Sequence, residues 1–112
     1  MNRPNGDEPL YTISIAARLV RRDKPEEPDI HPQTLRMYER LGLITPRRIG
    51  KNRLYSDRDI ERVRRIQEYT QVMGVNLAGV EIILTLLERM EEMQREMERL
   101  QAQMNERRNG DV

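Results

Sequence analysis

The chain has 112 residues, of which 35% are charged and 37% apolar, and its only aromatic residues are four tyrosines. This composition leaves room for one small domain and an appendage, and it argues against an enzyme with a large core and a deep pocket. The absence of cysteine excludes disulfides, thiolate metal sites and cysteine nucleophiles. No apolar run in the sequence approaches the length of a membrane span.

The net charge of +1 is unevenly distributed along the chain. Residues 31–68 carry ten Lys/Arg and five Asp/Glu, a net of +5, whereas residues 69–112 carry five Arg and eight Asp/Glu, a net of −3. A polyanion is the natural partner of the basic middle. The same polyanion would repel the acidic end, so the pattern indicates two roles in one chain.

The first nine residues contain no apolar signal core, and we expect a flexible leader there. Leu10–Ile13 is a short stretch that favours a strand, after which Ser14 or Thr12 can cap a helix over residues 15–20. Residues 21–29 contain two prolines and no apolar side chain, which predicts a surface loop.

A second helix is expected from Pro32 to Leu41, with Gly42 as its stop. Its apolar side chains, Leu35, Leu41 and nearby Tyr38, are expected to pack inward. The polar side chains of the same helix then face outward, and they are Gln33, Thr34, Arg36 and Arg40. A helix of this width fits the DNA major groove, and these residue types read base edges or bind phosphates. An ordinary solvated helix face is the alternative.

Two short stretches that favour strands flank Gly50-Lys51-Asn52, which predicts a hairpin. Four cations crowd into seven residues of it, namely Arg47, Arg48, Lys51 and Arg53. Such a density repels itself unless an anion neutralises it. A wing along the phosphate backbone, with a contact from the Tyr55 hydroxyl, would do so, and a soluble loop is the alternative. The glycine spacing does not match a phosphate-binding loop, so we reject nucleotide binding.

A third helix is expected to begin at the capping-box-like Ser56–Asp59 and to stop at Gly74. The apolar face predicted for this helix consists of Ile60, Val63, Ile66, Tyr69 or Thr70, and Met73. Asn76 can cap the next helix, which begins at Leu77.

In that last helix, apolar residues recur as the a and d positions of three heptads. They are Ile83, Leu86, Met90, Met93, Met97, Leu100 and Met104. The pattern predicts a coiled coil over about residues 83–104, and pairing with a second chain is the simplest way to bury it. The alternative is a helix folded back on its own domain. A two-fold dimer would present two recognition units and so predicts an inverted-repeat DNA site.

The sequence offers no catalytic constellation and no metal or cofactor site. His31 is the single histidine and stands beside Pro32, which favours a helix-start residue over a ligand. The carboxylates of the last helix lie outside the heptad seam, and we expect them to form a solvated face. They include Glu91, Glu92, Glu96 and Glu98.

Several segments in this order resemble the MerR family of transcription regulators. They are Tyr11-Thr12-Ile13, residues 34–44 (TLRMYERLGLI), Pro46, Arg48, Arg53-Leu54-Tyr55-Ser56 and Asp59-Ile60, and the match covers about residues 10–88. Residues 74–80 (GVNLAGV) are similar to the heat-shock repressor (HspR) branch of that family. The resemblance implies a winged helix-turn-helix followed by a long antiparallel dimerisation helix.

The resemblance also implies which residues contact DNA and who the partners are. Arg36, Tyr38, Arg53 and Tyr55 match family positions that contact DNA. Members of the branch repress chaperone operons at inverted repeats, with the DnaK chaperone as a co-repressor. Two features differ from the family pattern. The loop over residues 21–29 is about eight residues longer than usual, which a surface loop can absorb, and residues 105–112 are mostly polar.

The sequence therefore predicts a mainly α fold, a MerR-type winged helix-turn-helix with a small β-hairpin wing and a long C-terminal coiled-coil helix. The expected segments are a leader (1–9), a DNA-binding domain (10–80), a dimerisation coiled coil (81–108) and a disordered tail (109–112). We expect a homodimeric repressor of heat-shock genes in the bacterial cytoplasm, at the nucleoid. Gln33, Thr34 and Arg36 would read bases, and Tyr38 and Arg40 would hold phosphates. A coiled-coil adaptor, or an activator that responds to another signal, is the alternative.

Overall fold

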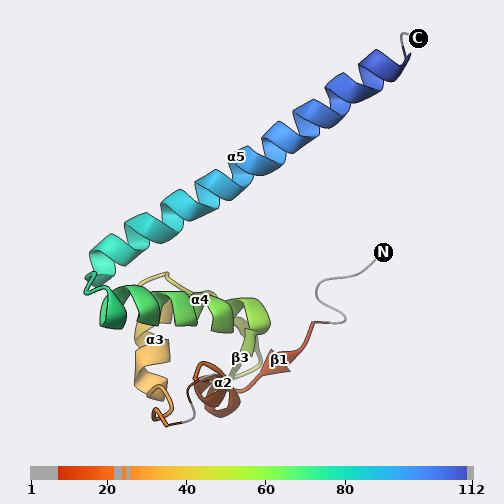
Figure 1. The fold of residues 1–112 in the computed structure, drawn as a ribbon. Helices are drawn as coiled ribbons and strands as arrows, with labels where there is room; N and C mark the ends of the chain where they lie inside the picture. Colours follow the sequence, from red (N-terminus) through yellow and green to blue (C-terminus); the bar gives the residue numbers. More distant parts are fainter. Residues whose placement is uncertain (1–7, 22–23, 25, 111–112) are drawn as a thin grey trace. The chain divides into compact units, whose positions relative to one another are not determined.

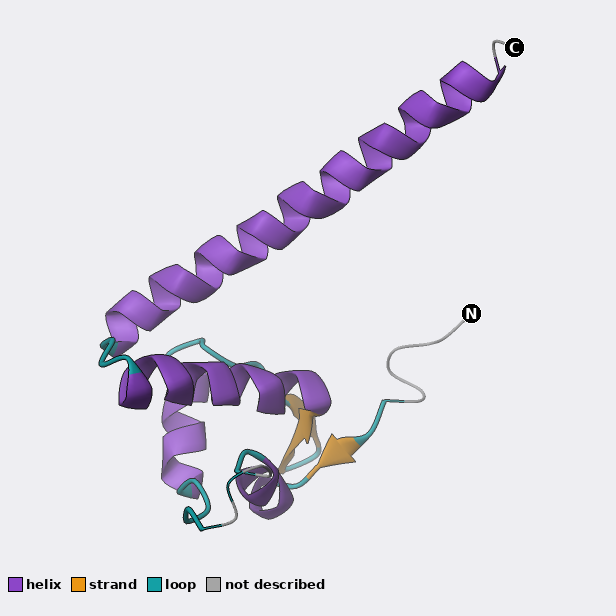
Figure 2. Cartoon of the chain, viewed as in Figure 1, coloured by secondary structure: helices purple, strands orange, loops and turns teal. Residues whose placement is uncertain are grey.

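The computed structural model describes residues 8–21, 24 and 26–110. The chain consists of two compact units, residues 1–74 and 75–112, so the division comes six residues before the expected boundary at 80. Figures 1 and 2 show a mainly helical chain with a small sheet, as predicted. Most of the expected leader (1–7), part of the expected loop (22, 23 and 25) and the last two tail residues (111–112) lie outside the described residues.

The first unit contains a three-stranded antiparallel sheet in the order β1-β3-β2. Its strands are β1 (Leu10–Tyr11), β2 (Arg47–Ile49) and β3 (Asn52–Ser56). Strands β2 and β3 form the predicted hairpin, and Ile49 pairs with Asn52 across a two-residue turn. Gly50 adopts a φ of +62° in that turn, which glycine tolerates without a side-chain clash.

The first unit also contains three helices: α2 (Ile13–Leu19), α3 (Pro32–Arg40) and α4 (Asp57–Gln67), the last continuing as a π-helical turn, η1 (Glu68–Val72). His31 caps α3, because its Nδ1 accepts a hydrogen bond of 3.1 Å from the backbone N–H of Gln33. The single histidine is thus a helix-start residue, as the sequence predicts. Gly42, with a φ of +77°, follows the end of α3.

The predicted capping box at the start of α4 is confirmed. The backbone N–H of Asp59 donates to Ser56 Oγ at 3.1 Å, and the N–H of Ser56 donates to Asp59 Oδ2 at 3.0 Å. Each side chain thereby satisfies a backbone donor that the first helical turn leaves unpaired. The box fixes the junction between β3 and α4, and with it the orientation of the hairpin relative to the helix.

The core of the first unit draws on every helix and on the sheet. Its buried apolar residues are Ala16, Ala17, Leu35, Tyr38, Leu43, Ile44, Tyr55, Ile60, Val63 and Ile66. For two residues the predicted burial is wrong. Leu41 is 48% exposed, because it lies about 120° around the helix from Leu35. Met73 is 62% exposed, because the wider π-turn rotates residues beyond it off the buried face of α4.

The second unit is essentially one helix, α5 (Leu77–Gly110), of 34 residues and about 50 Å in length. The predicted cap is present, since the N–H of Gly79 donates to Asn76 Oδ1 at 2.8 Å. The helix includes residues 109 and 110, so the predicted disorder of these two residues is wrong. Among the described helices, neither this one nor any other is long and apolar enough to cross a bilayer.

Candidate nucleic-acid interface

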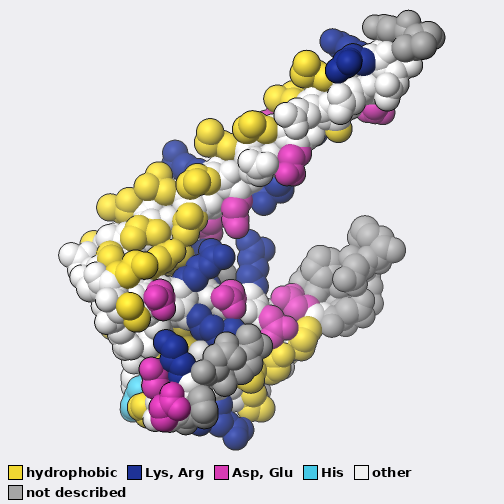
Figure 3. All heavy atoms as spheres, in the orientation of Figure 1, with side chains coloured by type: hydrophobic (Ala, Val, Ile, Leu, Met, Phe, Trp, Pro, Cys, Tyr) yellow, Lys and Arg dark blue, Asp and Glu magenta, His cyan; other side chains and the backbone are white. Residues whose placement is uncertain are grey.

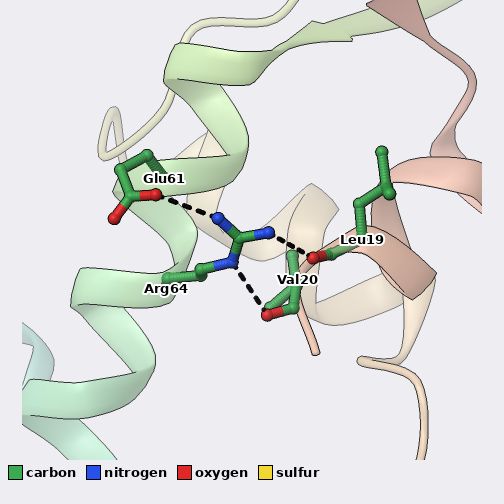
Figure 4. Close-up of polar contacts among 4 residues, drawn as sticks. All are labelled: Leu19, Val20, Glu61 and Arg64. Carbon is green, nitrogen blue, oxygen red and sulfur yellow. Dashed lines mark hydrogen bonds and ion pairs between the residues drawn. The ribbon is translucent and has the colours of Figure 1, made fainter. Parts of the chain in front are cut away.

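Helices α2 and α3 form the expected helix pair, and Arg64 of α4 holds the end of the first one (Figure 4). Its guanidinium donates to the backbone carbonyls of Leu19 and Val20, in the latter case from Nε at 3.1 Å. Glu61, one turn earlier on α4, receives a third bond at 2.9 Å. The last carbonyls of a helix lack partners within it, so a cation there both satisfies them and complements the helix dipole.

The long loop between the two helices is anchored at both ends. Arg21 forms an ion pair with Asp29 across the loop, and His31 caps the helix that follows. Helices α2 and α3 remain in contact despite the extra residues. The loop, α3 and α4 border a hollow of about 740 Å³, whose lining includes Thr34 and Tyr38. The extra residues therefore do not keep α2 and α3 from packing together.

The outward face of α3 brings together three of its four predicted recognition residues. Gln33, Arg36 and Arg40 follow one another at spacings of three and four residues, so they share one side of the helix. Gln33 and Arg40 are exposed and Arg36 is half-buried. Thr34 points elsewhere, since it borders the hollow beneath the loop with Tyr38. The structure thus separates Thr34 from the other three.

The hairpin is tied to α3 through Glu39, a residue that sequence reasoning did not single out. Arg53 Nε of β3 lies 2.5 Å from Glu39 Oε1, and an Arg48 nitrogen of β2 lies 3.7 Å from Glu39 Oε2. The Glu39 side chain is only 20% exposed, which strengthens its pull on the two cations. One carboxylate therefore sets the position of the hairpin against the helix. The sequence did contain a signal for the role of Glu39, because it is an acidic residue inside a basic segment.

A small basic hollow of about 180 Å³ lies where α2, α3 and the hairpin meet. Its lining consists of Thr12, Ile13, Arg36, Lys51, Asn52 and Arg53. Three of these residues are cations, and a hydroxyl and an amide stand among them. An anion with several oxygens, such as a phosphate, matches this set of donors. Sequence reasoning predicted the cations and missed Thr12 and Asn52, which serve there as polar lining.

Four of the predicted basic residues have no ion-pair partner among the described residues, and they are Arg36, Arg40, Arg47 and Lys51. Arg40 and Lys51 are exposed, and Arg36 and Arg47 are half-buried. Unpaired cations held close to one another raise the local positive potential. The candidate interface therefore has a positive potential that suits a polyanion. Among its predicted cations, Arg48 and Arg53 are partly neutralised by Glu39.

The two predicted tyrosines lie in the core rather than on the interface surface. Tyr38 is 3% exposed, and its hydroxyl accepts a hydrogen bond of 2.7 Å from Gln67 Nε2. The Tyr55 hydroxyl is fully buried without a hydrogen-bond partner among the described residues. Burial raises the pKa of both phenols, and for Tyr55 the nearby Glu39 adds to the effect. These positions do not fit the expected phosphate contacts, because a buried hydroxyl does not reach a phosphate on the surface.

The heptad seam of α5 is apolar and largely open in the single chain. Ile83 is half-buried, whereas the other six seam residues are between 45% and 65% exposed. Figure 3 shows apolar side chains following α5, with charged side chains on other sides of the helix. The four glutamates expected on a solvated face are all exposed, and Glu96 forms an ion pair with Arg99. A continuous apolar stripe of this length marks an interaction surface.

Comparison with known proteins gives two kinds of match. A family model described as "MerR HTH family regulatory protein" matches residues 22–102. The "Putative heat shock protein HspR" of Streptomyces coelicolor is 46% identical over 89 residues, which cover 79% of this chain and 54% of that protein. The "HTH-type transcriptional regulator MlrA" of Salmonella typhimurium and of Escherichia coli is 38% identical over 78 residues, 68% of this chain and 28% of those proteins.

The chain thus spans about half the length of the first of these relatives and about a quarter of the others. No solved structure matches it. The matched region contains α3, the hairpin, α4 and most of α5. The likeness therefore covers the candidate interface except Thr12 and Ile13, and the heptad seam except Met104.

Proposed function

This chain belongs to the MerR helix-turn-helix family of regulatory proteins, and on that basis we propose that it represses heat-shock genes by binding an inverted-repeat operator as a homodimer. The family and the MlrA relatives are described as regulators, in agreement with the prediction that the chain is not an enzyme. One observation supports the proposal most strongly: Glu39 of α3 forms ion pairs with Arg48 and Arg53, and so holds the basic hairpin beside the polar face of α3.

The residues of the interface divide into three groups by position. Gln33 and Arg36, near the start of α3, would read base edges in the major groove. The cations that surround them would hold the phosphate backbone, and these are Arg40, Arg47, Arg48, Lys51 and Arg53. Thr34, Tyr38 and Tyr55 would support the helix and the hairpin from within.

The seam of α5 would be covered by the same seam of a second chain. An isolated helix is marginal in water, and six exposed apolar residues at heptad spacing are complementary to a copy of themselves. The g positions hold Arg89 and Glu96, whereas the e positions hold Gln94 and Gln101. Antiparallel chains set g against g, which places Arg89 beside the partner's Glu96. A parallel pair would leave both charges opposite glutamines, so the charges favour the antiparallel dimer.

The heat-shock role rests on the likeness to the Streptomyces coelicolor protein, whose printed name is that of a heat shock protein. From the resemblance of residues 74–80 to the heat-shock repressor branch, we propose the DnaK chaperone as co-repressor and the bacterial cytoplasm, at the nucleoid, as the location. The described end of α5 bears little apolar surface for a chaperone, because residues 105–110 are polar apart from glycine and exposed.

A mobility shift at physiological salt tests the DNA-binding proposal. The probe is a chaperone-promoter duplex that contains an inverted repeat, and a scrambled duplex of equal composition is the reference. Arg36→Ala should abolish the preference for the promoter, whereas Arg58→Ala, which removes an exposed cation at the start of α4, should retain it. Equal shifts of both duplexes by the unmodified chain would overturn the proposal.

A coiled-coil adaptor is the second candidate, and the exposed glutamates on α5 favour it. In that case the acidic helix would recruit a protein and DNA binding would be incidental. Truncation at Glu88 distinguishes the two functions. The repressor requires the truncated chain to lose affinity for the inverted repeat, whereas the adaptor predicts unchanged DNA affinity and loss of the recruited protein.

A further inference from the structure

The heptad seam is unusually rich in methionine. Four of the seven methionines of the chain occupy a or d positions, and the chain has no cysteine. Met90, Met93, Met97 and Met104 are 62%, 65%, 54% and 62% exposed in the single chain. Methionine sulfur is therefore the readily oxidised group of this protein, and it is concentrated on the one surface that dimerisation would cover.

The antiparallel arrangement places methionine at the centre of the dimer. A seam that runs from Ile83 to Leu100 aligns Ile83 with the partner's Leu100, and it aligns Met90 with the partner's Met93. The two central layers then consist of methionine alone, and Met97 packs in the next layer against the partner's Leu86. Met104 falls at the end of this seam.

We propose that Met90, Met93 and Met97 form an oxidation-sensitive switch that dissociates the dimer; this inference rests on the dimer of the proposed function. The oxidant is a peroxide. The thioether sulfur attacks one peroxide oxygen, the O–O bond breaks, and a sulfur–oxygen bond forms. Each methionine loses two electrons and becomes a sulfoxide, and hydrogen peroxide is reduced to water.

A sulfoxide in this seam is destabilising because its oxygen requires hydrogen-bond donors. The seam neighbours are methionine, leucine and isoleucine, none of which donates. An unsatisfied polar oxygen in an apolar interface opposes burial. Modification of the central layers is expected to raise the dimer dissociation constant roughly a hundredfold or more, because several such oxygens would be buried at once.

The same geometry gives the switch a direction. The seam sulfurs are accessible in the single chain and covered in the dimer, so peroxide reaches them after the chains separate. Oxidation then prevents the chains from associating again. Heat or dilution, which favours separation, should accelerate the reaction, and methionine sulfoxide reductases should reverse it.

The first test measures oxidation rates of the full chain in hydrogen peroxide at several protein concentrations, by peptide mass mapping. Rates at Met90, Met93 and Met97 should fall as the concentration rises through the dimer dissociation constant. Met73, which is 62% exposed and lies outside the seam, is the matched control and should react at a constant rate. The oxidation rate at Met104, at the end of the seam, should depend on concentration less than the rates at the other seam methionines do. Rates at the seam that do not depend on concentration would overturn the proposal.

The second test measures mass by sedimentation before and after oxidation. The unmodified chain should change from dimer to monomer, and a Met90→Leu, Met93→Leu, Met97→Leu variant should remain a dimer under the same peroxide. A Met37→Leu, Met73→Leu variant should dissociate like the unmodified chain. A dimer that persists with all three sulfurs oxidised contradicts the switch. A chain that is monomeric before peroxide contradicts the proposed function instead, so the two failures are distinguishable.

Discussion

The two units of the chain satisfy their apolar residues in different ways. Among the described residues, ten of the twelve buried apolar side chains belong to the first unit, and helix α5 contributes only Val80 and Leu84. The first unit also contains the long-range polar contacts, such as those of Arg64 and Glu39. The seam of α5 has its apolar stripe open and only local polar contacts, such as the ion pair between Glu96 and Arg99.

The difference indicates that the first unit is stabilised by its own core, whereas the apolar stripe of α5 is left exposed in the single chain. A core with interlocking polar contacts holds its geometry in a single chain, which suits a surface that must match DNA. In the proposed homodimer, the exposed apolar stripe of α5 is covered by a second chain, so its state should change with protein concentration.

Charging the seam should have the largest effect. Met93→Lys with Met97→Lys places two cations in the apolar stripe, and the dimer should be lost because buried like charges repel. Affinity for an inverted repeat should fall by about a hundredfold or more, since the two half-sites are no longer bound together. Analytical ultracentrifugation and a mobility shift measure the two effects. Glu92→Lys, on the exposed side of the helix, should leave both unchanged.

Truncating a core side chain of the first unit should lower the stability of that unit. The effect should be the same in a monomer and in a dimer. Ile66 is fully buried in α4, and Ile66→Ala should reduce the free energy of unfolding by about 3 kcal/mol. Val72→Ala, at a side chain that is 65% exposed, is the control and should cost less than about 0.5 kcal/mol. Chemical denaturation provides the values, and equal costs at the two positions would contradict the described core.

Removing a hairpin cation should have a moderate effect on DNA binding. Arg53→Ala should weaken binding to every duplex about tenfold and lower the salt slope by about one, because the proposed contact with phosphate is lost. Titrations at four salt concentrations measure the slope. A changed sequence preference with an unaltered slope would contradict the assignment.

Glu39→Gln provides the companion experiment. It preserves the cations but removes the carboxylate that positions them, so affinity for the specific site should fall severalfold relative to affinity for random DNA. The ratio of the two affinities, measured at one salt concentration, is the readout. An unchanged ratio would show that Glu39 does not position the hairpin.

The two buried tyrosines should respond differently to loss of their hydroxyls. Tyr38→Phe removes the hydrogen bond from Gln67 and should cost about 1 kcal/mol of stability. Tyr55→Phe removes a buried hydroxyl that has no described partner, so stability should be unchanged or slightly raised. Thermal unfolding compares them. A large loss of DNA affinity in Tyr55→Phe with unchanged stability would restore the direct phosphate contact.

The smallest predicted effect is a pH dependence at the alkaline end. Burial raises the pKa of Tyr38 and Tyr55, so the folded state retains their protons more strongly than the unfolded state. The stability that this provides is complete below the ordinary pKa of about 10 and is lost as pH rises through the folded-state values. Denaturation curves between pH 9 and 11 should show a decline that is shallower in each Phe variant.

Local signals in the sequence predicted much of the fold. Gly42, Gly50 and Gly74 all adopt positive φ values at the expected turns, and the Ser56 and Asn76 caps form as predicted. These signals depend on a few neighbouring residues, so the sequence alone reveals them. The heptad seam was likewise visible from its spacing.

Features that depend on tertiary contacts were not predictable. The π-turn moves Met73 out of the core, and the burial of the Tyr55 hydroxyl depends on how the sheet packs on the helices. Glu39 and Thr12 belong to the candidate site only because α2, α3 and the hairpin meet there. Patterns along one helix do not contain that information, because it arises from segments distant in sequence.

We propose that two copies of one interface, joined by the α5 seam, bind DNA together. This can be tested by selecting bound duplexes from a random pool with the full chain and sequencing them. One inverted repeat whose half-sites have a fixed spacing should be enriched. The same selection with the Met93→Lys, Met97→Lys variant should yield single half-sites at best. Enrichment of unpaired half-sites by the unmodified chain, or no enrichment at all, would contradict the claim.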